Sequence, residues 1–230
     1  MAFRHSAKHS LAVGACARWR GVEHIPWLYD GLMSLADGLG FVRWRQALVW
    51  TARGRTLEVG CGTGRNLPLY PSRVSVIGLD PDPQSLARAQ RRAPHIPLVA
   101  AQVEALPFRA GTFDTVVSSL VFCSVEDPAQ GLREIRRVLR AEGRLLMLEH
   151  VRSSRPFWAK LQDRIQPLWT YVSGGCRPNR ETETAVAAAG FRIDPSDREA
   201  TDVLRRFGAH PISSEGTPRN EFGASVLQRP

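Results

Sequence analysis

The stretch Glu58-Val-Gly60-Cys-Gly62-Thr-Gly64 decides the fold. Thr56-Leu57 before it is typical of a buried strand, and Arg65-Asn66-Leu67 after it is a suitable start for a helix. Glycines spaced by two let the backbone turn sharply and approach a ligand with no Cβ between them. A helix that begins here would point its free N–H groups and its positive dipole end at an anionic group. We therefore predict a strand–turn–helix unit that binds a ligand.

A second half of this site follows along the chain. The segment Val76-Ile-Gly-Leu-Asp80 is a buried apolar strand that ends in a carboxylate 20 residues after Gly60. An acid at the tip of the second strand of such a unit accepts hydrogen bonds from ribose hydroxyls. Asp114, at the head of Thr115-Val-Val117, adds a third feature. The alternative is an ordinary turn whose glycines only permit the bend, and the three features together favour a nucleoside site.

Apolar runs alternate with helical patterns over most of the chain. Two helices are predicted within 21–53, and the region 208–220 is loop-like, with 221–228 as a last edge strand. Alternating strands and helices imply a mostly parallel sheet with helices on both faces. The prediction is an α/β, Rossmann-like, doubly wound, seven-stranded sheet with an N-terminal helical cap. Its remaining elements are strands 55–60, 75–80, 97–101, 113–118 and 143–150, and helices 64–70, 83–93, 128–140 and 155–172.

Composition places few limits on function. The net charge of +9 and the pI near 10.4 fit an anionic partner, such as nucleic acid or acidic lipid, or simply a generally arginine-rich composition. Cysteines at 16, 61, 123 and 176 form no CxxC pair and no zinc spacing, so a reduced cytoplasmic setting without a metal is expected. No window holds the roughly 18 apolar residues of a membrane span, and the apolar run near residue 11 is too short for a signal peptide. The expected location is cytoplasmic, with peripheral membrane association as an option.

The glycine loop with its preceding acid resembles motif I of class I S-adenosylmethionine (SAM) methyltransferases. Tyr29-Asp30, Ala105–Phe108 and Leu132–Leu139 resemble the methyltransferase type 11 group and its menaquinone/ubiquinone C-methyltransferases. A further set resembles the mammalian membrane-associated alkyl-thiol methyltransferases, whose hydrophobic N-terminal anchor has no counterpart in this sequence: Leu120–Val125, Leu148–Val151, Pro167–Trp169, Gly174–Cys176 and Asn179–Thr182. The resemblance covers roughly 27–191.

The resemblance implies a SAM site. The glycines would wrap the methionine half, Glu58 would hold the loop or the amino group, and Asp80 would bind the ribose. Gln102 stands where the family usually has an acid, and its carbonyl can accept from the adenine amine. Tyr29 either closes over the cofactor or is a core tyrosine. The full predicted cofactor set is Tyr29, Glu58, Gly60, Cys61, Gly62, Thr63, Gly64, Asn66, Asp80, Pro81, Gln102, Val103, Glu104 and Ser119.

The methyl acceptor is expected beyond the carboxyl ends of the fourth and fifth strands. His150 is the candidate general base, because imidazole titrates near neutral pH, and the alternative is a structural histidine. Cys176 either lines the acceptor pocket or is a small buried residue, and Arg180 either binds an acidic group or pairs with Glu181 or Glu183. The predicted substrate-binding residues are Cys123, Glu149, Cys176 and Arg180. The aromatic helix 155–172 is either a lid over an apolar acceptor or an amphipathic helix packed on the sheet.

These observations predict a SAM-dependent methyltransferase that acts on a small lipophilic acceptor, with a thiol sulfur as the specific hypothesis. The alternatives are quinone C-methylation or phospholipid N-methylation at a membrane surface, and a non-catalytic SAM-binding protein. Nucleic-acid methylation is disfavoured, because Ser118-Ser-Leu-Val121 lacks both the Asn/Asp-Pro-Pro-aromatic and the Pro-Cys signatures. No nucleic-acid partner is expected, and the oligomeric state is left open. The predicted organisation is a basic mobile segment 1–20 and one domain 21–230, with cap 21–53, cofactor-binding core 54–151 and acceptor-side region 152–230.

Overall fold

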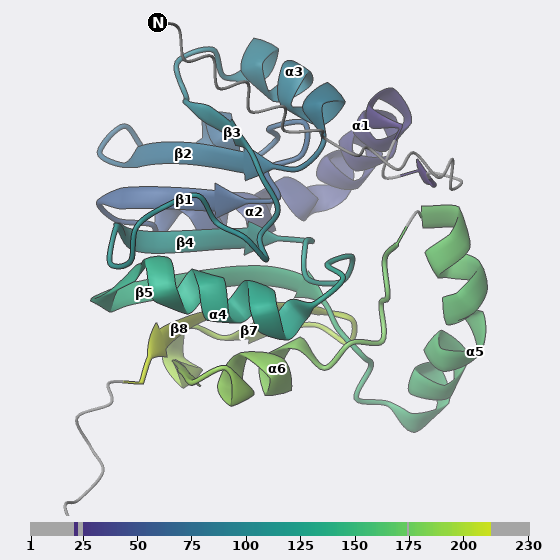
Figure 1. Ribbon diagram of the computed structural model, residues 1–230. Helices are drawn as coiled ribbons and strands as arrows, with labels where there is room; N and C mark the ends of the chain where they lie inside the picture. The colour runs from purple at the N-terminus through teal and green to yellow at the C-terminus, as the bar shows by residue number, and fades with distance from the viewer. Residues whose placement is uncertain (1–20, 23–24, 174, 213–230) are drawn as a thin grey trace, which may run out of the picture.

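The computed structural model describes residues 21–22, 25–173 and 175–212, which form an α/β fold around one central sheet (Figure 1). The sheet has eight strands, one more than predicted, because the two-residue strand β7 pairs with β8 beside the main path. β3, β2, β1, β4 and β5 are parallel, whereas β8 runs antiparallel to its neighbours. In spatial order the path is β3 (Leu98–Ala100), β2 (Ser75–Asp80), β1 (Arg55–Val59), β4 (Phe113–Ser119), β5 (Leu139–His150), β8 (Leu204–Pro211) and β6 (Phe191–Ile193), with β7 at Glu199–Ala200.

Helices cover both faces of the sheet, as predicted. Successive strand residues point to opposite faces, so Val116 packs in the core beneath α4 (Pro128–Val138) and α6 (Thr182–Ala188). The next residue, Val117, packs against α2 (Val42–Trp50) on the other face. α3 (Pro83–Arg92) packs beside β2 and β3 through Ala89.

Two further helices lie beyond the carboxyl ends of the parallel strands (Figure 1). These are α1 (Pro26–Ala36), which continues through a π-helical turn (Asp37–Phe41) into α2, and α5 (Pro156–Ser173). Along α5 only Ala159 and Ser173 are buried, while Phe157 and Leu168 are 72% and 68% exposed. The aromatic residues of α5 therefore do not pack on the sheet, and the amphipathic-helix interpretation is wrong. None of the helices in the described part of the chain is long and apolar enough to cross a bilayer.

The predicted helix 64–70 is absent. A three-residue 3-10 helix, Leu67–Leu69, stands there instead, because Pro68 has no N–H to donate and disfavours helical geometry at the residue before it. No long helix therefore points its dipole at the glycine loop, and that part of the sequence argument is wrong. The predicted loop from 208 is also wrong at its start, since β8 continues to Pro211. The predicted strand 221–228 lies outside the described residues.

Asp114 occupies the edge of the sheet opposite to the glycine loop. It lies near the amino end of β4, where its Oδ2 accepts the backbone N–H of Arg55 at 2.8 Å. Its Oδ1 forms an ion pair with Arg140. Asp114 therefore joins β1, β4 and β5 and has no part in the predicted nucleoside site.

Candidate active site

A hollow of about 330 Å³, its open mouth included, lies where β1 leaves the sheet. It is enclosed by the glycine loop, by α1 and α2, and by the turn after β4. Ligand sites in α/β sheets lie at the carboxyl ends of the strands, which is where this hollow lies. Its lining residues are Tyr29, Arg45, Glu58, Gly60, Cys61, Gly62, Thr63, Arg65, Asn66, Ser119 and Leu120.

The glycine loop is held in a shape that requires glycine. Gly62 and Gly64 have φ angles of +53° and +77°, in the left-handed region that side chains disfavour. A Cβ on Gly64 would lie 2.8 Å from the Cα of Ala89, so this glycine lets α3 pack against the loop. A Cβ on Gly62 would have no protein atom within 4 Å. The space in front of Gly62 is therefore open, whereas Gly64 serves packing.

Asp80, at the end of β2, fixes this loop. Its Oδ2 accepts the Gly62 N–H at 2.8 Å, and its Oδ1 accepts the Asp82 N–H at 2.9 Å. Each carboxylate oxygen can accept a second hydrogen bond. The side chain therefore joins the tips of the first two strands.

Glu58 and Asn66 form a buried pair in the wall of the hollow. Glu58 Oε1 accepts from Asn66 Nδ2 at 2.9 Å. Burial raises the pKa of Glu58 from 4.5 to about 7, although the hydrogen bond from Asn66 and the charge of Arg45 oppose that rise. Among the described residues, Asn66 Oδ1 has no hydrogen-bond partner. Buried polar atoms are normally paired, so this oxygen is suited to a donor on a ligand.

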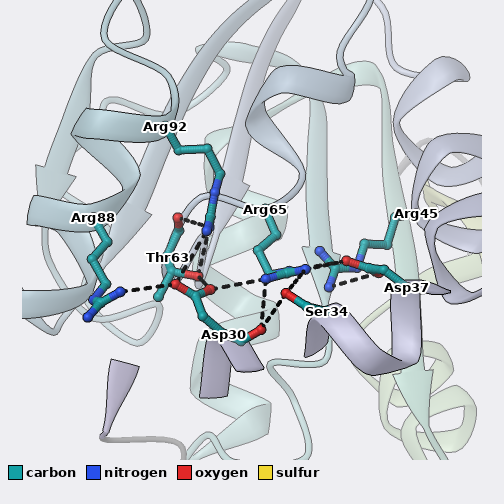
Figure 2. A network of polar contacts seen from close by, with 8 residues as sticks. All are labelled: Asp30, Ser34, Asp37, Arg45, Thr63, Arg65, Arg88 and Arg92. Carbon is teal, nitrogen blue, oxygen red and sulfur yellow. Dashed lines mark hydrogen bonds and ion pairs between the residues drawn. The ribbon is translucent and has the colours of Figure 1, made fainter. Parts of the chain in front are cut away.

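A network of ion pairs ties α1 to the glycine loop and to α3, and Figure 2 shows it converging on Asp30. Asp30 Oδ1 accepts from the Thr63 hydroxyl at 2.7 Å and from Arg65 at 3.2 Å. Its Oδ2 accepts from Arg88 and Arg92, each at 3.3 Å. Although burial alone would raise the pKa of Asp30, hydrogen bonds from Thr63, Arg92 and Arg65 hold it below the ordinary value of 3.8.

The network continues along the turn between α1 and α2. Arg65 also binds Asp37 at 2.6 Å, and Asp37 in turn lies 3.4 Å from the buried guanidinium of Arg45. Arg45 and Arg65 both line the hollow. The N-terminal cap is therefore held over the glycine loop by charges in the middle of α1, just after α1 and in α2.

We expect Asp30→Ala to loosen α1 without unfolding the sheet. A hydrogen bond to a charged group contributes about 1.5–3 kcal/mol, so amide hydrogen exchange across residues 26–36 should quicken by at least tenfold. Hydrogen-exchange mass spectrometry measures this directly. Glu183 on α6 forms a 2.7 Å ion pair with Arg198, so Glu183→Ala is the matched control and should leave α1 unchanged. Equal exchange of α1 in the two variants would contradict the assigned role of Asp30.

The other rim of the site is built by the ends of β4 and β5. Leu120, directly after β4, is the one non-glycine residue with positive φ (+59°) in the described part of the chain, and it lines the hollow. The fully buried Glu149 supports this turn: its Oε1 accepts from Ser118 Oγ at 2.8 Å and from the N–H groups of Val121 and Phe122 at 3.2 Å. Burial raises the pKa of Glu149 to about 7. Glu149 thus anchors the loop from beneath.

Three predicted acceptor-side residues come together at this rim. Three atoms all lie within 4.8 Å of one another: the sulfur of Cys123, one ring nitrogen of His150 and the sulfur of Cys176. Arg180 donates to the backbone carbonyl of Phe122 beside them. Of the two alternative partners predicted for Arg180, Glu181 and Glu183, the second binds Arg198 instead.

The structure gathers most of the predicted cofactor set. Eight members line the hollow: Tyr29, Glu58, Gly60, Cys61, Gly62, Thr63, Asn66 and Ser119. Gly64 and Asp80 support the loop from outside. Pro81 and Gln102 are exposed, Val103 is in the core, and Glu104 accepts the Asp127 N–H at 3.4 Å. Asp30, Arg45, Arg65 and Leu120 were not among the residues predicted from the sequence. The Tyr29-Asp30 pair was a signal for the first, and nothing in the spacing indicated the others.

A parallel sheet of this topology, with a glycine loop after β1 and an acid after β2, defines the Rossmann-like fold of nucleotide-cofactor enzymes. Residues 57–147 match the family described as a methyltransferase domain. A solved SAM-dependent methyltransferase from Thermotoga maritima shares the fold, with a TM-score of 0.62 and 19% identity over 81% of this chain and 98% of that one.

Curated relatives agree on the class and differ in the acceptor. The chain is 37% identical over 151 residues to the human thiol S-methyltransferase TMT1B, and this alignment covers 62% of each protein. It is 40% identical over 103 residues to a phosphatidylethanolamine N-methyltransferase of Cereibacter sphaeroides, covering 42% of this chain and 51% of that protein. It is 33% identical over 121 residues to the ubiquinone/menaquinone C-methyltransferase UbiE of Geotalea uraniireducens, covering 46% and 52%. The chain thus spans less than two thirds of the length of these relatives.

The residues of the hollow fit SAM, whose use the domain family implies. SAM carries an ammonium, a carboxylate, ribose hydroxyls and an adenine amine. The hollow offers the buried carboxylate of Glu58 and the unpartnered oxygen of Asn66 for donors, and open space in front of Gly62. Asp80 stands at the tip of β2, where ribose hydroxyls are bound in related folds.

Proposed function

We propose that the protein transfers a methyl group from SAM to the thiol of a small lipophilic molecule. The observation that carries the methyl-donor half is the glycine loop, held by Asp80 at Gly62 and walled by Glu58. The acceptor half is supported by the human relative named as a thiol S-methyltransferase and by the Cys123–His150–Cys176 group beside the hollow. Thiol chemistry is preferred because that relative matches over more of this chain than the other two do.

In this proposal the hollow and the strand tips beside it each hold one part of SAM. Glu58 binds the ammonium, the amides around Gly62 face the methionine carboxylate, Asp80 binds the ribose hydroxyls and Gln102 accepts from the adenine amine. SAM supplies a methyl group on a sulfonium, which leaves as a neutral thioether. The protein's task is then to position the acceptor and to exclude water. The cap held by Asp30 closes the hollow on one side.

The acceptor approaches from the ends of β4 and β5. A thiol is a better nucleophile after it loses its proton, and His150 is the residue that the sequence argument assigns to that proton. Helices α1 and α5 lie at the same end of the sheet (Figure 1). Both carry exposed apolar residues, such as Leu35 (65% exposed) and Leu168 (68%). They suit a lipophilic acceptor that enters past them.

Glu58 should make SAM binding depend on pH. Its pKa near 7 means that about half of the carboxyl is neutral at pH 7, and the cationic ligand favours the ionised form. Binding therefore releases a proton, and the Kd for SAM should be about tenfold higher at pH 6 than at pH 8. Because the folded pKa lies above the ordinary 4.5, Glu58 also makes the fold less stable as pH rises from about 4.5 to 7.

Titration calorimetry in two buffers of different ionisation enthalpy counts the released proton. Glu58→Gln keeps the shape, and we expect it to bind SAM more weakly with the pH dependence lost. Wild-type affinity that does not change between pH 6 and pH 8, or a slope retained in Glu58→Gln, would contradict the ammonium assignment.

Radiolabelled SAM with a panel of alkyl and aryl thiols, quinols and phosphatidylethanolamine vesicles tests the acceptor. We expect label in the methyl thioethers. Label in the lipid instead would favour the second candidate, phospholipid N-methylation, which the Cereibacter relative and the exposed aromatic side chains of α5 support. Flotation with vesicles, with and without residues 1–20, tests that version separately.

A further inference from the structure

The group at the acceptor rim is a set of metal-ligand donors. Cys123 and Cys176 are 2% and 3% exposed, and His150 is half-buried beside them. One donor atom from each lies within 4.8 Å of the other two. The three residues come from the turn after β4, the end of β5 and the segment after α5. The sequence-based expectation of no metal rested on local spacing, and local spacing cannot detect ligands that only the fold brings together.

Backbone contacts hold the two cysteine segments in place, and the Cys123 thiol also donates to the carbonyl of Leu120. Arg177 N donates to Cys123 O at 2.8 Å and so joins the two cysteine segments. Cys176 N donates to Ser173 Oγ at 3.1 Å, and Cys176 O accepts from Thr170 Oγ1 at 2.9 Å. A ligand set that is fixed in advance loses little entropy when a metal binds.

We propose that Cys123, His150 and Cys176 bind one Zn²⁺ ion, with the acceptor sulfur as the fourth ligand. The role of the acceptor sulfur rests on the proposed function. Two thiolates and an imidazole are a donor set that zinc prefers, and two thiolates neutralise its charge. Catalytic zinc sites have three protein ligands and one open position, whereas structural sites are closed. This cluster has three protein ligands at the rim of the hollow, and one of them, His150, is only half-buried. It therefore fits a catalytic zinc site.

The cluster adjoins the cofactor hollow. Cys123 Sγ lies 3.6 Å from the carbonyl oxygen of Leu120, and Leu120 lines the hollow. An acceptor thiol that binds zinc gives its proton to solvent. Its sulfur lone pair then forms the bond to the methyl carbon, the carbon–sulfonium bond breaks with its electrons passing to the cofactor sulfur, and a thioether and S-adenosylhomocysteine result. His150 then acts as a ligand and not as the base.

The test uses the purified full chain, stripped with a chelator and titrated with Zn²⁺ against a chromophoric competitor. We expect one zinc per chain in the wild type and at least a hundredfold loss of affinity in Cys123→Ser, Cys176→Ser and His150→Ala. Cys61→Ser removes another buried cysteine, one outside the cluster, and should keep wild-type zinc affinity. Co²⁺ in place of zinc should give the thiolate-to-cobalt charge-transfer band of a tetrahedral site.

A readout on the wild type guards against variants that do not fold. Zinc should protect Cys123 and Cys176 from alkylation, as mapped by peptide mass spectrometry, and leave the alkylation of Cys61 unchanged. A wild type that binds no zinc, or variants with unchanged affinity, would overturn the site. Thiol methylation at full rate by zinc-free protein would overturn its role in the reaction. Tight zinc binding without thiol methylation would uphold the metal site and reject the thiol acceptor.

Discussion

Gly62→Val should lower the affinity for SAM by at least a hundredfold. The added side chain would project into space that no protein atom occupies within 4 Å of the Cβ, and that space is the one assigned to the ligand. A hundredfold loss corresponds to about 2.7 kcal/mol of binding free energy. Calorimetric titration with SAM and with S-adenosylhomocysteine measures the loss.

Gly111→Val provides a matched control. Gly111 has a φ of +63°, close to the +53° of Gly62, and its Cβ would also meet no atom within 4 Å. Both variants therefore carry a similar backbone strain, about 1–2 kcal/mol, and should lose similar stability in thermal unfolding. Only Gly62→Val should lose ligand binding. Equal affinities in the two variants would show that the hollow is not the SAM site.

Asp80→Ala should have the second large effect, on stability and binding together. The substitution leaves the N–H groups of Gly62 and Asp82 without their carboxylate acceptor in a place where the side chain is only 8% exposed. Hydrogen bonds to charged groups contribute about 1.5–3 kcal/mol each, so we expect a loss of about 3 kcal/mol of unfolding free energy. SAM binding should fall below detection, because the ribose loses its acceptor as well.

Asp82→Ala separates these two effects. Asp82 caps α3 by accepting from Ser85 N at 3.0 Å and lies two residues from Asp80. Loss of an N-cap costs about 1 kcal/mol, and SAM affinity should remain near that of the wild type. A variant Asp80→Ala that binds SAM as tightly as Asp82→Ala would remove the ribose assignment.

The sequence was sufficient for the core of the fold because buried parallel strands appear as continuous apolar runs. Strand β2 was predicted at its observed bounds, 75–80, and β1 to within one residue. The glycine loop and Asp80 were found because special backbone geometry and a fixed strand spacing restrict residue choice locally. The predicted helix 83–93 also begins at the observed first residue of α3, Pro83.

The errors came where tertiary context overrode local pattern. Pro68 shortened the helix expected after the loop, and β8 formed through Gly208 because pairing with β5 and β6 outweighs the weak strand preference of that segment. The Asp30 network and the Cys123–His150–Cys176 group were not predicted as units, since each joins side chains from segments far apart in the sequence. Only the fold makes such residues neighbours.

The measurement that bears most directly on the central claim is a crystal structure of the protein with S-adenosylhomocysteine. The account predicts density for the ligand in the hollow at residues 60–64, with its ribose hydroxyls on the Asp80 carboxylate and its ammonium at Glu58. Density for the ligand at any other place, or crystals soaked to saturation in which this hollow stays empty, would contradict it.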